Sequence, residues 1–136
     1  MLSAELGGKM SDIPENLYYT AEHEWIRVEG DDLVVGITDH AQDALTEIVY
    51  VELPDVGTII EEQDEFSSIE SVKSVSSIFA PLAGNITEVN EELDDTPELI
   101  NQDPYGAGWI VRIVPRDIDA VNGLLNAAAY REVIGE

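Results

Sequence analysis

Short runs in which apolar and polar residues alternate, or in which β-branched residues dominate, recur along most of this chain. Alternation with a period of two is typical of a half-buried strand. Residues 29–32, which include Gly30, separate two such runs in a pattern that predicts a β-hairpin. Pro54 and Gly57 mark a further turn. Strands are expected at residues 25–28, 33–37, 48–53, 58–60, 66–71, 74–80, 84–89 and 109–114.

Helical segments are predicted between and after these strands. Thr38 or Asp39 is a suitable N-cap for a short helix over residues 39–45. Pro97 suits the first position of a single helical turn over residues 97–100.

The C-terminus follows a different period. From residue 117 onward apolar residues fall near helical spacing, which predicts a mainly helical segment with a break at Gly123 or Asn126. Many short strands followed by a helix predict an all-β barrel or sandwich with a helical appendage.

Lys73 lies between the predicted strands at residues 66–71 and 74–80, where we expect the tip of a hairpin. The chain has 6 lysines and arginines against 29 aspartates and glutamates, and its other lysine, Lys9, lies in a stretch with little predicted structure. A lysine held out by a rigid sheet is accessible to an enzyme that modifies it. An ordinary surface lysine on a turn fits the same spacing, so both interpretations stay open.

The composition is that of one globular domain. Of 136 residues, 44% are hydrophobic and 26% are charged. The chain has no cysteine, which excludes disulfides, thiolate metal sites and a cysteine nucleophile. It shows no apolar run of about 20 residues and no signal or transit peptide pattern, so we expect a cytoplasmic protein. Residues 1–16 are expected to be a flexible segment, with Met10 as an alternative start.

The formal net charge of −23 disfavours nucleic acids and anionic membranes as partners. Phosphate groups are bound by clustered lysines and arginines, which this chain lacks. An acid-rich, lysine-poor surface suits a salt-rich cytoplasm, so a halophilic source is one interpretation. Docking onto basic partners is the other, and the composition does not separate the two.

Several ordered blocks of the sequence form a family pattern, at residues 23–25, 36–42, 51–57, 68–73, 80–84 and 97–106. Together these blocks resemble the H-protein family of the glycine cleavage system. Val72 and Ser74 beside Lys73 favour this family over biotin carriers, which usually place methionine on both sides, and over the lipoyl domains of 2-oxoacid dehydrogenases, which usually place aspartate before the lysine.

The resemblance implies a hybrid barrel-sandwich fold over residues 17–136, with short helices and a C-terminal helix. It implies that Lys73 carries lipoate in amide linkage and that Glu70, Ser71, Val72 and Ser74 form the attachment motif. The lipoyl arm would accept an aminomethyl group from glycine decarboxylase (P protein) and pass it to the aminomethyltransferase (T protein). Dihydrolipoamide dehydrogenase (L protein) would reoxidise the arm.

The same resemblance extends to the protein's other properties. Lipoate would be attached by a lipoate ligase or by a lipoyl or octanoyl transferase. The chain would be a monomeric carrier without catalysis of its own.

Departures from the family pattern concern the pocket for the arm. Thr46 and Ser67 stand where glycine is frequent, and Ser77 stands where many members have aspartate. By position, Glu24 and His40 are candidates to contact the arm, as is Ser77. Glu24 could equally be a solvated strand residue, and His40 could be a helix-start histidine paired with Asp39 or Asp43.

Other functions fit the sequence less well. No Gly-x-Ser-x-Gly elbow supports a hydrolase. The two histidines are distant in the sequence, which argues against a metal hydrolase, and no metal is expected. An unmodified acidic scaffold and an H-like protein that only relays lipoate to other enzymes stay as alternatives.

Overall fold

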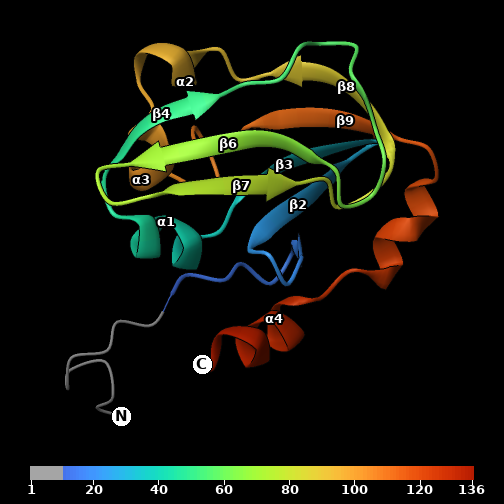
Figure 1. Cartoon of the computed structure of the whole chain (residues 1–136). Coiled ribbons are helices and arrows are strands. Elements are labelled where there is room, and N and C mark those ends of the chain that lie inside the picture. Colours follow the sequence, from blue (N-terminus) through green and yellow to red (C-terminus); the bar gives the residue numbers. More distant parts are fainter. Residues whose placement is uncertain (1–10) are drawn as a thin grey trace.

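Two antiparallel sheets form the body of the molecule in a computed structural model, which describes residues 11–136 (Figure 1). The larger sheet has six strands in the order β1-β2-β3-β9-β8-β5, and the smaller has three in the order β4-β6-β7. The strands are β1 (Tyr18–Tyr19), β2 (Glu24–Glu29), β3 (Asp32–Ile37), β4 (Ile48–Glu52), β5 (Ile59–Ile60), β6 (Glu65–Ser71), β7 (Val75–Phe79), β8 (Gly84–Val89) and β9 (Val111–Pro115).

Short helices lie around the sheets. They are α1 (Asp39–Leu45), α2 (Glu92–Asp95), α3 (Leu99–Gln102), the 3₁₀ helix η2 (Ile118–Gly123) and the C-terminal α4 (Ala127–Ile134). The prediction of a mainly β chain with short helices and a C-terminal helix is confirmed. No helix among the described residues has the length and apolar character needed to cross a membrane.

Both predicted hairpins form. Strands β2 and β3 pair up to Glu29 and Asp32, and Gly30 between them adopts a φ of 63°, which glycine tolerates better than other residues. Strands β6 and β7 pair up to Glu70 and Val75, which leaves Lys73 in the connecting turn. The predicted hairpin tip is therefore confirmed.

Strand β3 is buried on both of its faces. Leu33 and Val35 point into the main core between the sheets, whereas Val34 belongs to a second cluster on the other face of the larger sheet. Burial on both faces explains why this strand is a continuous apolar run. The second cluster contains Ile13, Leu17, Tyr19, Trp25, Val34, Ala127 and Tyr130.

The second cluster joins both ends of the described chain. Ile13 is 5% exposed, and Arg131 of α4 donates to the Ile13 carbonyl and pairs with Glu15. Residues 11–16 of the segment predicted to be flexible therefore pack against the domain. The rest of that segment, with Lys9 and Met10, lies outside the described residues.

The helices differ from the prediction in detail. Helix α2 was not expected, and α3 begins two residues later than the predicted turn at 97–100. Each is four residues long and buries one apolar side chain, Leu93 or Ile100. So short a helix depends on that tertiary contact and leaves no periodic pattern in the sequence. The predicted C-terminal break is confirmed, since η2 ends at Gly123 and Asn126 caps α4.

Candidate functional site

The turn that carries Lys73 is held by several hydrogen bonds. The Ser71 hydroxyl accepts hydrogen bonds from the backbone N–H groups of Lys73 (3.1 Å) and Ser74 (3.0 Å). The Ser71 N–H donates to the Ser74 carbonyl (2.8 Å), and the Val72 N–H donates to the Glu47 carbonyl (3.0 Å). The backbone is thus fixed while the side chains of Val72, Lys73 and Ser74 are exposed. Ser71 was predicted only as part of a motif, and its contacts give it a structural role in the turn.

Lys73 has no charged partner among the described residues. Each arginine of the chain forms an ion pair with a carboxylate, but the lysine forms none. Its ammonium group instead donates to the carbonyl of Ala44 in the last turn of α1, at 3.3 Å. No strong interaction therefore has to be broken to modify this amine.

A cavity of about 160 Å³ lies beside Lys73, between α1 and the β6–β7 hairpin. Ala44, which contacts the lysine, is one of its lining residues. The apolar lining residues are Ile37, Ala41, Ala44, Leu45, Ile69 and Ile78, and the polar ones are Glu22, His23, Glu24, His40, Ser76 and Ser77. The three residues predicted to contact an arm, Glu24, His40 and Ser77, are all in this lining.

Glu24 is buried, with 1% of its surface exposed. Its carboxylate accepts a hydrogen bond from the Thr20 hydroxyl and another from the Phe79 N–H at 3.2 Å. Burial raises the pKa of Glu24 to about 7, while the two hydrogen bonds act in the opposite direction. The alternative of a solvated strand residue is therefore wrong. Glu24 instead connects the start of β2 to the end of β7.

Ser77 lies on β7, and its hydroxyl donates to a carboxylate oxygen of Glu65 at 2.8 Å. Position 77 carries no acid, as the sequence already indicated. A carboxylate nevertheless lies within hydrogen-bond distance of it, supplied by the first residue of β6. Sequence reasoning missed Glu65 because strand pairing, not sequence spacing, brings it there.

His40 lies against His23, with ring centroids 4.9 Å apart. The predicted alternative, a pair of His40 with Asp39, does not form in the described part of the chain: the Asp39 carboxylate accepts hydrogen bonds from the Gln42 side-chain amide and from the Asp12 N–H. The expectation that the two histidines are too far apart to act together, drawn from their distance in the sequence, is thus wrong. The β2–β3 hairpin explains the error, because its register places Glu24 opposite Ile37 and brings His23 beside Thr38, whose N–H donates to the His23 carbonyl. The hairpin register was the signal that could have predicted this pair.

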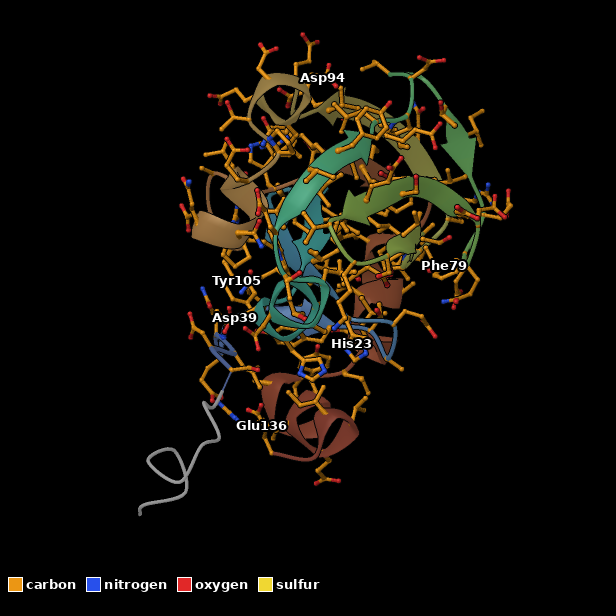
Figure 2. All side chains as sticks on the ribbon, turned by 60° about the vertical axis from the view of Figure 1, so that its left-hand side comes forward. His23, Asp39, Phe79, Asp94, Tyr105 and Glu136 are labelled. Carbon is orange, nitrogen blue, oxygen red and sulfur yellow. The ribbon has the colours of Figure 1, made fainter. Side chains whose placement is uncertain are left out.

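His23 and Tyr130 complete the polar side of the site, and neither was predicted as a site residue. His23 has a φ of 76°, which is uncommon for a residue other than glycine. Its Nδ1 lies 2.8 Å from the Tyr130 hydroxyl of α4, and Figure 2 shows His23 between α1 and α4. Burial and the neighbouring His40 ring lower the pKa of His23. No group of three or more potential metal ligands occurs within residues 11–136.

The two positions where glycine was expected have different surroundings. Thr46 ends α1 with a φ of 65°, a conformation that glycine adopts more readily. Ser67 is buried at an irregular position of β6, and its hydroxyl donates to the Glu52 carbonyl at 2.6 Å. The Ser67 hydroxyl therefore has a hydrogen-bond partner, whereas a glycine at this position would have no side-chain group that needs one.

Comparison with known proteins agrees with this geometry. The family model described as glycine cleavage H-protein matches residues 17–136. Glycine cleavage system H proteins of Thermus thermophilus and Halorhodospira halophila are 55% identical over 123 residues and 50% identical over 128 residues. These alignments cover 90% and 93% of this chain and 96% and 98% of the relatives.

A solved structure also matches. The crystal structure of a glycine cleavage system H protein from Mycobacterium marinum aligns with a TM-score of 0.84 and 41% identity, covering 91% of this chain and all of that one. The two sheets with their short helices are accordingly the hybrid barrel-sandwich that the sequence predicted. From the family model, the relatives and the shared fold, we conclude that this chain belongs to the glycine cleavage H-protein family.

Proposed function

We propose that this chain is the lipoyl carrier of the glycine cleavage system and that Lys73 carries lipoate in amide linkage. The observation that supports this most directly is an exposed lysine without a charged partner, on a turn with a fixed backbone, beside a cavity with an apolar wall. Glu70, Ser71, Val72 and Ser74 form the motif around it, and Ser71 supplies the turn's hydrogen bonds.

The residues present fit a lipoyl group. The hydrocarbon chain and sulfur ring of lipoate are apolar, and the lining residues Ile37, Leu45 and Ile69 offer apolar surface to receive them. The lysine side chain already reaches Ala44 at this cavity, so an arm attached to it starts at the lining. When bound, lipoate supplies a disulfide that can open to carry the aminomethyl group of glycine.

The chain's own residues have positioning roles in this proposal. The β6–β7 hairpin holds the attachment point, so the arm moves while its base does not, and a tether raises the effective concentration at each partner's site. Where the arm lies in this cavity, the apolar side chains would exclude water from it. Glu24, His40 and Ser77 supply polar groups to the same cavity.

The partners follow from the proposed role. They are glycine decarboxylase, the aminomethyltransferase, dihydrolipoamide dehydrogenase and the ligase or transferase that attaches lipoate. We propose that the chain is a cytoplasmic monomer that catalyses no step alone.

Mass spectrometry and an exchange assay test the proposal. Protein purified from glycine-grown cells of its source should carry lipoate on Lys73, as measured by intact mass and peptide mapping. Only the lipoylated form should support glycine–bicarbonate exchange with glycine decarboxylase. An unmodified Lys73 would contradict the attachment site. A lipoylated protein inactive in exchange would favour a lipoate relay instead.

A further inference from the structure

Three hydrogen-bonding side chains form a continuous path from α1 through α4 to the cavity. The Thr38 hydroxyl lies 2.7 Å from the Tyr130 hydroxyl, which lies 2.8 Å from His23 Nδ1. Thr38 is the N-cap of α1, and Tyr130 comes from the opposite end of the chain. Figure 2 shows His23 at the junction of these helices.

The direction of these hydrogen bonds follows from the number of protons and acceptors. Thr38 is fully buried, and its oxygen already accepts the Ala41 N–H at 3.2 Å. Its own proton needs an acceptor, and among the described residues the Tyr130 oxygen is the one within reach. Thr38 therefore donates to Tyr130, because the reverse direction would leave a buried hydroxyl proton unpaired.

The proton of Tyr130 is then available for His23. Burial raises the pKa of Tyr130 to about 12, so the hydroxyl keeps its proton at neutral pH. Donation to Nδ1 requires that nitrogen to be unprotonated, which puts the proton of a neutral imidazole on Nε2. A charged His23 would carry a proton on Nδ1 as well. Nδ1 would then donate to Tyr130 and Tyr130 to Thr38, which is the reverse of the direction that the protons and acceptors require.

We propose that Tyr130, together with Thr38, is a positioning residue that holds His23 as the neutral Nε2–H tautomer and so gives the cavity a fixed hydrogen-bond donor for the lipoyl arm. His23 Nε2 makes no hydrogen bond within residues 11–136, so its N–H is available to an acceptor atom of the arm. The donor role rests on the proposed function, whereas the tautomer does not. The positive φ of His23 agrees with this role, because residues with a strained backbone cluster at functional sites.

Tyr130→Phe is the most direct test because it removes only the hydroxyl. The ring stacks on Tyr19, with centroids 4.8 Å apart, and phenylalanine keeps that contact. Tyr19→Phe is the matched control, since it removes a hydroxyl of the same cluster that donates to the Pro14 carbonyl instead. Melting curves of both variants verify that they fold.

The tautomer is measured by ¹⁵N NMR of the imidazole nitrogens in the unmodified protein. We expect an unprotonated Nδ1 and a protonated Nε2 for His23 in the wild type and in Tyr19→Phe, and a mixture of tautomers in Tyr130→Phe. Thr38→Ser, which keeps a hydroxyl, should preserve the wild-type state, and Thr38→Val should not. A protonated Nδ1 in the wild type would overturn the assignment.

The contact with the arm is measured in the lipoylated, reduced protein as the rate at which iodoacetamide alkylates its thiols. A mixture of tautomers weakens the hydrogen bond to the arm, so this rate should rise in Tyr130→Phe by up to about fivefold, the effect of losing one neutral hydrogen bond, with no change in Tyr19→Phe. Equal rates in the wild type and Tyr130→Phe would refute the donor role. Lack of lipoylation would refute the proposed function but leave the tautomer measurement intact, so the two failures are distinguishable.

Discussion

Glu24 provides a quantitative prediction from burial alone. Its pKa rises from an ordinary value of 4.5 to about 7, chiefly because the carboxylate is removed from water. At about 1.4 kcal/mol per pH unit, this difference corresponds to roughly 3 kcal/mol between the two protonation states. Because the side chain is 1% exposed, solvent screening does not reduce this value much.

The sign follows from the number of bound protons. Between pH 4.5 and 7 the folded state keeps the Glu24 proton that the unfolded state has released. The stabilisation from that proton is complete below pH 4.5 and is lost as the pH rises through 7. The substituted side chain of Glu24→Gln cannot ionise. The free energy of unfolding of this variant, relative to that of the wild type, should therefore increase between pH 4.5 and 7 by up to about 3 kcal/mol.

Denaturant unfolding at pH 5, 6, 7 and 8 in constant salt measures this difference. Any constant cost of replacing the bonds to Thr20 and Phe79 cancels when the variant–wild-type difference is compared between pH values. Glu62→Gln, at an exposed position, is the control, and its curve should parallel the wild type. A difference for Glu24→Gln that stays constant from pH 5 to 8 would show that burial does not hold the proton on Glu24.

Three further predictions concern attachment, salt and packing. Lys73→Arg should abolish lipoylation, as measured by intact mass, and a lipoylated variant would contradict Lys73 as the site. Because the side chain is exposed, the same change should alter the free energy of unfolding by less than about 0.5 kcal/mol. The net charge of −23 implies repulsion among carboxylates, which molar KCl screens over a length of about 3 Å. The free energy of unfolding should therefore rise by a few kcal/mol from dilute to molar KCl, and unchanged denaturation midpoints would argue against this repulsion. Gly36→Ala should lower stability by about 1–3 kcal/mol in the same assay, because a Cβ would lie 2.7 Å from buried Trp25, whereas Gly123→Ala, with open space around it, should not.

Much of the fold could be predicted from local patterns. Runs rich in β-branched residues defined β2 and β3, alternating residues defined β6 and β7, and the position of Lys73 between the last two placed it at a hairpin tip. Thr38 was identified as a candidate N-cap because serine, threonine, aspartate and asparagine are favoured there. These features depend on neighbours within a few residues, so the sequence contains the information that sets them.

The candidate site was only partly predictable. Glu24, His40 and Ser77 were proposed from a family resemblance, and the structure brings them to one cavity. The burial of Glu24 could not be read from the sequence, because its hydrogen bond to Phe79 joins residues 55 positions apart. A glutamate in a strand has the same sequence pattern whether water or another sheet covers it.

The amino-acid sequence by itself therefore determined most of the strands, though not β1, and it determined the place of Lys73 between two of them and the strong negative charge. Only the tertiary structure decided that Tyr130, 107 residues away from His23, reaches the place where His23 and His40 meet. The physical reason is the packing of α4 onto the outer face of the larger sheet, where Tyr130 and Trp25 share one buried cluster. Strand order and helix packing bring distant residues together, and no local periodicity records which residues will meet.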